Sequence, residues 1–165
     1  MFKISTINKV SIIITLILLT ISYVRSEPIN KASINVDEFK SENKDKFILL
    51  NYWASWCPVC ASEGEIFNEY NSRPSWAVLG INAEWGGGSK ERILSFNKML
   101  EVSRRFRYNF PVTVGVKDDK AIFPIPTTII VDTNGKIAGA ITGKLSEELL
   151  RIEVKKYLKD KRAQK

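Results

Sequence analysis

The sequence predicts an α/β domain in which helices flank a mixed β-sheet. Continuous apolar runs at 47–53 and 76–81 have the length and composition of strands that are buried on both faces. Segments with helical spacing of apolar residues alternate with these runs, and Asn134-Gly135 links two further strand-like segments as a hairpin turn would. With 165 residues, the chain is long enough for one domain with a sizeable core.

The N-terminal segment 1–26 predicts a signal peptide or a membrane anchor. Lys3 and Lys9 precede fifteen uncharged residues at 10–24, and Arg25 ends the run. This run is short for a bilayer span, which needs about 20 apolar residues, but residues 10–24 could hold the protein at the inner membrane. Cleavage between Ser26 and Glu27 is the alternative, and both interpretations place the domain in the periplasm or another extracytoplasmic space.

Polar residues at 27–35 are typical of a linker, and we expect the folded domain to span 36–160. Residues 36–43 read as a short helix, and the strand at 47–53 follows. A helix from Cys57 to Tyr70 begins with Pro58, which suits the first helical position. The next buried strand is expected at 76–81.

The second half of the domain continues the alternation of strands and helices. A glycine-rich loop at 84–89 ends at Ser89, a candidate N-cap for a helix that runs to about Phe106. Pro111 makes the strand at 111–116 an edge strand, because proline cannot donate to a neighbouring strand. A hairpin at 127–132 and 136–142 follows, then a helix at 146–158 with Ser146 as N-cap and a basic tail at 161–165.

Composition excludes several classes of function. The chain has no histidine, which rules out Ser-His-Asp and Cys-His nucleophile systems and removes the commonest metal ligand. Cys57 and Cys60 are its only cysteines, too few for a four-cysteine zinc site or an iron–sulfur cluster within one chain. The net charge of +7 falls to +4 without residues 1–26, and we expect no nucleic-acid partner.

The Cys57-Pro-Val-Cys60 motif is the candidate reactive site. Cys57 falls where a buried strand leads into a helix, whose free N–H groups favour a thiolate over a thiol. Cys60 lies one turn later on the same face, so we interpret Cys57 as an exposed nucleophile and Cys60 as a buried resolving thiol. A structural disulfide, a zinc half-site and a Cu(I) site remain alternatives, although a disulfide across so short a loop stabilises little.

The segment FILLNYWASWCPVC at 47–60 resembles the active-site segment of thioredoxin-fold proteins. It is most similar to the exported, often membrane-anchored TlpA/ResA/DsbE branch of thiol–disulfide oxidoreductases. The segment FPIPTTIIVDTNGK at 123–136 resembles the second signature of that family, in which a cis-proline precedes a hairpin. The resemblance covers about residues 36–160 and implies a thioredoxin fold, with Asn51 where thioredoxins carry a buried aspartate.

The resemblance also implies roles for residues around the cysteines. Pro126 occupies the cis-proline position, so we expect a cis Ile125–Pro126 bond facing the Cys57 sulfur. Ile125 would then offer its backbone to an extended protein substrate, and Trp56 and Pro58 would line the same substrate surface.

Glu63 lies three residues after Cys60 and so shares its helical face. In ResA-like proteins, a glutamate at this position takes part in proton transfer. Buried here, it would have a raised pKa and could relay the Cys60 proton, whereas the alternative is a solvent-facing glutamate. The chain departs from the family at Glu65, where a kinking proline is usual.

Together these features predict an extracytoplasmic thiol–disulfide oxidoreductase that acts on protein substrates through Cys57 and Cys60. Strong oxidants of this fold carry a histidine between the cysteines, whereas Pro58-Val59 offers none, so we expect a reductant. The resemblance to DsbE-like members implies that this reductant serves cytochrome c maturation. An oxidase, an isomerase and a non-catalytic metallochaperone are the alternatives. We expect a monomer without cofactor or metal, which receives electrons from a membrane or periplasmic thiol protein.

Overall fold

The computed structural model describes residues 34–84, 89–115 and 124–163, with the side chains of 89–96 left out. The elements, in chain order, are α2 (Val36–Glu42), β1 (Phe47–Trp53), α3 (Pro58–Ser62), α4 (Gly64–Ser72), β2 (Trp76–Asn82), α5 (Ser89–Arg105), β3 (Val112–Val114), β4 (Thr127–Val131), β5 (Ile137–Thr142) and α6 (Glu147–Ala163). Helices and strands therefore alternate much as the apolar pattern predicted.

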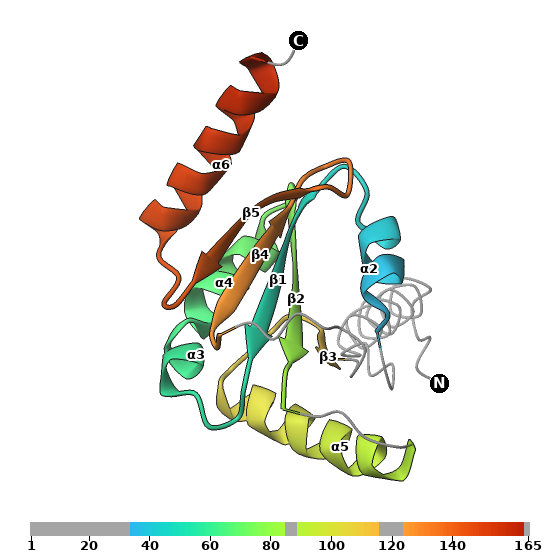
Figure 1. The fold of residues 1–165 in the computed structure, drawn as a ribbon. Helices are drawn as coiled ribbons and strands as arrows, with labels where there is room; N and C mark the ends of the chain where they lie inside the picture. The colour runs from blue at the N-terminus through green and yellow to red at the C-terminus, as the bar shows by residue number, and fades with distance from the viewer. Residues whose placement is uncertain (1–33, 85–88, 116–123, 164–165) are drawn as a thin grey trace, which may run out of the picture. The chain divides into compact units, whose positions relative to one another are not determined.

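A five-stranded mixed sheet forms the centre of the domain, in the order β3-β2-β1-β4-β5 (Figure 1). β1 pairs in parallel with β2, which pairs in parallel with β3. β1 and β5 both run antiparallel to β4. The mixed sheet and the edge position of β3 confirm the sequence predictions, and together with the flanking helices they give a thioredoxin-like fold.

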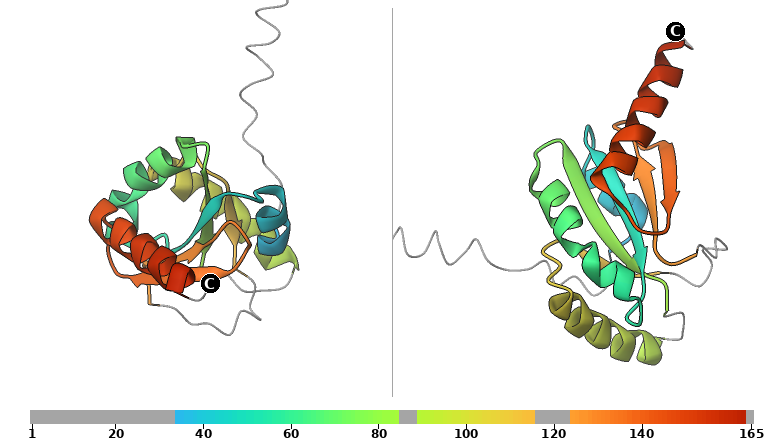
Figure 2. Two further views of the ribbon diagram at one scale, coloured as in Figure 1. Left: turned by 90° about the horizontal axis from the view of Figure 1, so that it is seen from above. Right: turned by 90° about the vertical axis from the view of Figure 1, so that its left-hand side faces the viewer.

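Alternate residues of β1 point to opposite faces of the sheet, and each face has its own core. Ile48 and Leu50 pack with Phe39 of α2 on one face. Leu49 and Trp53 lie in the other core, with Phe67 of α4 and apolar residues of α5 and α6. Figure 2 shows α2 and α4 on opposite sides of the sheet. Both faces are covered, so β1 is buried along nearly its whole length.

The expected helix from Cys57 to Tyr70 is wrong in one respect, because it is broken at Glu63. α3 ends at Ser62, and α4 begins at Gly64. The Cys60 carbonyl accepts hydrogen bonds from the Glu63 amide at 3.3 Å and from the Tyr108 hydroxyl at 2.9 Å. The second donor is 48 residues away in the chain, so helical periodicity alone could not reveal the break.

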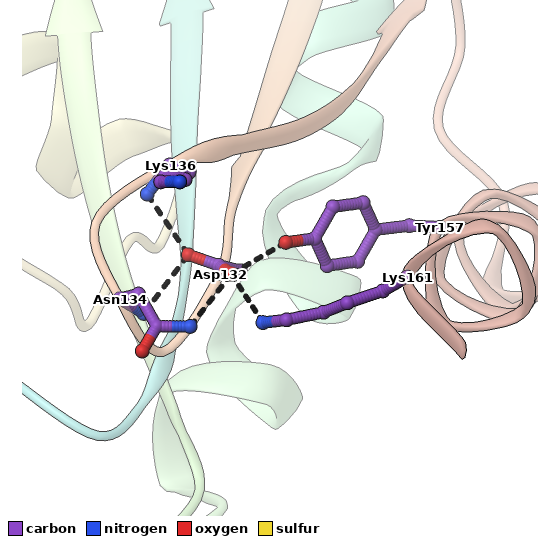
Figure 3. Close-up of polar contacts among 5 residues, drawn as sticks. All are labelled: Asp132, Asn134, Lys136, Tyr157 and Lys161. Atoms are coloured by element: carbon purple, nitrogen blue, oxygen red, sulfur yellow. Dashed lines mark hydrogen bonds and ion pairs between the residues drawn. The ribbon is translucent and has the colours of Figure 1, made fainter. Parts of the chain in front are cut away.

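The turn between β4 and β5 is built around Asp132. Its carboxylate accepts hydrogen bonds from the amides of Asn134 and Lys136, and Gly135 takes a positive φ of 78° (Figure 3). The Tyr157 hydroxyl and the Lys161 ammonium of α6 also donate to Asp132, at 2.5 and 3.0 Å. This carboxylate therefore joins the hairpin turn to the last helix.

α6 begins after Ser146, whose hydroxyl accepts from the Leu149 amide at 3.2 Å, as an N-cap does. The helix continues to Ala163, three residues into the segment that we expected to be a basic tail. Lys161 is therefore a helical residue with a buried partner. At the start of α5, Ser89 is the first helical residue, but the side chains of Ser89, Ile93 and Phe96 lie outside the described residues.

The predicted leader at 1–26 and linker residues 27–33 lie outside the described residues. The last two residues of the expected linker contact the domain: Ile34 exchanges two hydrogen bonds with Thr113, and Asn35 caps α2. Within the described residues, every helix is too short or too polar to cross a bilayer.

Candidate active site

A disulfide joins Cys57 and Cys60 where β1 leads into α3, with an S–S distance of 2.08 Å. Cys57 is the N-cap residue, Pro58 is the first helical residue, and Cys57 Sγ accepts from the Cys60 amide at 3.1 Å. The same N–H group would stabilise a Cys57 thiolate in the reduced protein, because a hydrogen bond to the charged form favours it.

The structure differs from the expectation of an exposed Cys57. In the disulfide form, Cys57 is 4% exposed and Cys60 is fully buried, so both sulfurs lie in the core cluster of the α4 face. The exposed surface at this point belongs to the neighbours: Trp56 is 68% exposed, Val59 is 37% exposed, and Pro58 is also exposed. The exposed surface beside Cys57 is therefore largely apolar.

The Ile125–Pro126 peptide bond is cis, as predicted. Pro126 directly precedes Thr127, which pairs with Tyr52 of β1, so it lies at the sheet end where β1 leads into the Cys57 loop. Pro126 is buried, and half-buried Ile125 packs against the cluster that contains both cysteines. Direct contact of Pro126 with Cys57 Sγ stays a prediction.

Glu63 is fully buried at the junction of α3 and α4, so the solvent-facing alternative is wrong. Its Oε1 accepts from the Leu145 amide, and its Oε2 has no hydrogen-bond partner within the described residues. Burial raises the pKa of Glu63, although the Leu145 hydrogen bond and the positive charge of Lys144 oppose the change. The carboxyl group therefore holds its proton more tightly than an exposed glutamate does.

Further polar atoms of β1 lie on the same side of the sheet as the cysteines. Asn51 is fully buried, and neither its Oδ1 nor its Nδ2 has a well-aligned hydrogen-bond partner within the described part of the chain, although its amide lies close enough to the Tyr108 hydroxyl to lower the pKa of that phenol. The Trp53 Nε1–H, two residues later on the same face, also has no hydrogen-bond partner among the described residues. Burying polar groups without hydrogen bonds costs free energy of folding, and such groups in a native protein call for an explanation such as a catalytic or redox role.

Tyr108 is a residue of this site that the sequence analysis missed. Its hydroxyl donates to the Cys60 carbonyl at 2.9 Å. Burial raises the pKa of Tyr108, and the negative charge of nearby Glu63 adds to the effect. Tyr108 lies in an irregular segment between α5 and β3, where no local pattern in the sequence distinguishes it.

Glu84 also escaped the sequence analysis, which treated it as the start of a loop. Its carboxylate accepts from both the amide and the hydroxyl of Ser55, two residues before Cys57. The Asn82 side chain donates to the same carboxylate at 3.1 Å. Glu84 thus fixes the loop between β1 and α3 to the end of β2.

Comparison with known proteins identifies relatives of the chain, although no family model matches it. Thiol-disulfide oxidoreductase ResA of Bacillus subtilis is 31% identical over 117 residues, which cover 67% of this chain and 60% of the relative. ResA of Geobacillus thermodenitrificans is 28% identical over 125 residues, which cover 72% and 64%. The matches therefore span somewhat under two thirds of these relatives.

A solved structure has the same fold. It is a secreted Mycobacterium tuberculosis disulfide oxidoreductase homologous to E. coli DsbE, with a TM-score of 0.52 and 15% identity over 70% of this chain and 84% of that one. The chain belongs to the ResA/DsbE/TlpA-like branch of the thioredoxin-fold thiol–disulfide oxidoreductases. Its membership accounts for the Cys57-Pro-Val-Cys60 motif and for the cis-proline before β4.

Within this ResA/DsbE/TlpA-like protein, the structure brings most of the predicted site residues to one end of the sheet. Trp56, Pro58 and both cysteines follow β1, and Ile125 and Pro126 precede its partner β4. Glu63 follows the last residue of α3 and is fully buried, whereas Trp56, before the helix, is exposed.

Proposed function

We propose that the protein reduces disulfides of extracytoplasmic protein substrates through Cys57 and Cys60. The observation that carries this proposal is the Cys57–Cys60 disulfide at the start of α3, with the buried carboxyl group of Glu63 at the other end of that helix. A nucleophile, a resolving thiol and a proton acceptor thereby lie within two helical turns.

The first step is attack by the reduced Cys57 thiolate on a substrate disulfide. A bond forms between Cys57 Sγ and one substrate sulfur, the substrate S–S bond breaks, and the second substrate sulfur leaves as a thiolate. The Cys60 amide, which donates to Cys57 Sγ, stabilises the attacking thiolate. Exposed Trp56, Pro58 and Val59 provide apolar contacts for the substrate chain.

The second step resolves the mixed disulfide. Cys60 loses its proton, its sulfur attacks Cys57 Sγ, and the remaining substrate sulfur leaves as a thiolate. The substrate gains two electrons and the protein is left with the Cys57–Cys60 disulfide. We infer that Glu63 accepts the Cys60 proton, since its raised pKa brings it closer to that of a thiol than an exposed carboxylate would be.

A reductant fits the residues between the cysteines. Pro58 and Val59 provide no charged partner for the Cys57 thiolate, so its reduced form lacks the extra stabilisation that makes a strong oxidant. Electrons would return from a dithiol protein of the membrane or periplasm, whose own thiols become a disulfide. Apocytochrome c is the substrate that we propose, in keeping with the family resemblance.

The basic leader and apolar run at 1–26 support an extracytoplasmic location. The secreted Mycobacterium tuberculosis relative of known structure has the same fold. We therefore propose that the domain works in the periplasm or an equivalent space, either released after cleavage or held at the membrane by residues 10–24.

Trapping of substrates tests the proposal. In Cys60→Ser, the mixed disulfide on Cys57 cannot be resolved, so substrates should stay covalently bound and be released by a reducing agent. Cys57→Ser is the matched control and should trap none. Recovery of apocytochrome c supports the maturation role, and recovery of many unrelated envelope proteins contradicts it in favour of a general oxidase or isomerase.

A Cu(I)-binding measurement on the reduced protein separates the enzyme from a metallochaperone. Tight binding of Cu(I) without any disulfide exchange would contradict the proposed enzymatic function.

A further inference from the structure

Tyr108 holds an unusual position behind the disulfide. Its hydroxyl group donates to the carbonyl of Cys60, one of the two cysteines. The side chain of Asn51 in β1 lies beside the same hydroxyl. In an uninterrupted helix, this carbonyl would accept from the amide four residues later, that of Gly64. The Tyr108 hydroxyl therefore takes the place of the Gly64 amide as a donor to the Cys60 carbonyl, and α3 ends two residues after Cys60.

Aromatic neighbours fix the Tyr108 ring. It stacks on Phe110 with ring centroids 4.6 Å apart, and it meets Trp53 and Phe106 edge to face at 5.4 and 5.6 Å. These three neighbouring rings restrict the Tyr108 ring, so packing as well as the hydrogen bond directs its hydroxyl at Cys60.

Gly64, the first residue of α4, makes room for this ring. A Cβ atom at Gly64 would lie 2.8 Å from the Phe106 carbonyl oxygen and 3.2 Å from a ring carbon of Tyr108. Any other residue at this position would push the 106–108 segment away from the helix. Gly64 and Tyr108 are therefore complementary parts of one contact.

We infer that Tyr108, together with Gly64, holds the break between α3 and α4 and so positions Glu63 behind Cys60. Glu63 is the single residue between the two helices, so the direction of its side chain depends on the geometry of the break. Tyr108 is a positioning residue, since it acts through the Cys60 backbone and Glu63. The inference rests on the proposed thiol–disulfide function of the same site.

The groups that act on Glu63 come from two other parts of the chain. Lys144 and the Leu145 amide belong to the loop before α6, and Tyr108 lies between α5 and β3. Cys60 precedes Glu63 by three residues in α3. Loss of the Tyr108 hydroxyl would free the Cys60–Gly64 turn and let water reach the Glu63 carboxyl group. Because burial is the main cause of the raised Glu63 pKa, that pKa should then fall.

Tyr108→Phe tests this inference, because it removes the hydroxyl and keeps the ring. In the oxidised protein, where the cysteines do not titrate, the Glu63 carboxyl titration is followed by ¹³C NMR. We expect its midpoint to fall by about one pH unit, which is about a tenfold change in proton affinity. Tyr157→Phe is the matched control, since that hydroxyl donates to Asp132, and it should leave the Glu63 midpoint unchanged.

Glu65→Pro provides a rescue. Position 65 is the second residue of α4, where proline is tolerated, and a proline there cannot continue a helix from α3. In Tyr108→Phe/Glu65→Pro, the break should be restored and the Glu63 midpoint should return towards that of the unaltered protein. A Glu63 midpoint that stays low in the double variant would overturn the inference that Tyr108 acts on Glu63 through the break between α3 and α4.

An unchanged or higher midpoint in Tyr108→Phe would overturn the inference altogether. Because this titration needs no substrate, the test is separate from that of the proposed function. A shifted Glu63 midpoint in a protein that exchanges no disulfides would contradict the function and support the positioning role.

Discussion

The two cysteines share a disulfide but differ in their backbone surroundings. Cys57 is the N-cap of α3, and its sulfur accepts the Cys60 amide hydrogen bond. Cys60 is fully buried inside the helix, with its carbonyl bonded to Tyr108. After reduction, the sulfur that has an N–H donor and lies beside the exposed Trp56 is the better nucleophile.

We therefore predict that iodoacetamide alkylates Cys57 before Cys60 in the reduced protein. The Cys60 amide stabilises the Cys57 thiolate, and Cys57 keeps a small exposed surface of 4%, whereas Cys60 has none. Peptide mass spectrometry after short exposures measures both rates, with the single variants Cys57→Ser and Cys60→Ser as controls. Faster labelling of Cys60 would contradict the assigned roles.

Glu63→Gln should change how stability depends on pH. The pKa of Glu63 is raised in the folded protein, so the folded state binds this proton more tightly than the unfolded state does. The resulting contribution to the free energy of unfolding is complete below the ordinary pKa of 4.5. That stability is lost as the pH rises towards the folded pKa, at about 1.36 kcal/mol per pH unit. Glutamine keeps an acceptor for the Leu145 amide and cannot ionise.

We expect Glu63→Gln to gain in free energy of unfolding relative to the unaltered oxidised protein as the pH rises above 4.5. Urea denaturation of both proteins across pH 4–8 measures the difference. Glu65→Gln, at an exposed neighbouring carboxylate, is the control and should show no such trend. A constant difference for Glu63→Gln across this range would contradict burial of an ionisable group.

At the scale of elements, one carboxylate ties α6 to the β4–β5 hairpin. Burial opposes ionisation of Asp132, but hydrogen bonds from Tyr157, the Lys136 amide, Asn134 and Lys161 outweigh it and hold its pKa below the ordinary value of 3.8. In the loop before α6, the Leu145 amide donates a hydrogen bond to Glu63. Asp132 thus fixes the C-terminal half of α6, while the loop before the helix contacts the active site.

Asp132→Asn should lower the free energy of unfolding at neutral pH by about 1–3 kcal/mol, because it weakens hydrogen bonds to a buried charged group. The pKa of Asp132 is depressed, so its contribution is complete above 3.8 and is lost as the pH falls through the lower folded value. The deficit should therefore shrink below pH 3.8, as urea denaturation would show. A deficit that is the same at neutral and acidic pH would contradict an ionised Asp132.

At the scale of the whole molecule, the sheet gathers distant segments at one end. β1 delivers Trp56 and the cysteines, antiparallel β4 starts there with Pro126, and Glu84 from the end of β2 holds Ser55. Among the described residues at this end, Trp56 is the most exposed large apolar side chain, at 68%. A large aromatic side chain so exposed contributes little to the core and is suited to contact with a partner.

Trp56→Ala should therefore reduce kcat/KM for protein disulfides by about tenfold, equivalent to about 1.4 kcal/mol of binding to the transition state. Reduction of glutathione disulfide, which is too small to cover this surface, should change much less. Val59→Ala removes a smaller exposed apolar side chain and is the comparison variant. Equal losses for protein and small disulfides would show that Trp56 supports the cysteines and not the substrate.

The sequence by itself determined most of the elements and the chemistry of the reactive motif. Apolar runs predicted β1 and β2, Asn134-Gly135 predicted the hairpin, and Cys57-Pro-Val-Cys60 pointed to thiol–disulfide exchange. These are local properties, because apolar spacing, turn residues and the separation of two cysteines each involve residues that are close together in the sequence.

Tertiary structure decided what depends on contacts between distant residues. Whether Glu63 is buried depends on Leu145, 82 residues later, and the break after α3 depends on Tyr108. The buried state of Cys57 in the disulfide form follows from packing of the whole core cluster. No short window of sequence contains these partners, so only the folded chain shows which side chains surround the disulfide and how its nearest carboxyl group holds a proton.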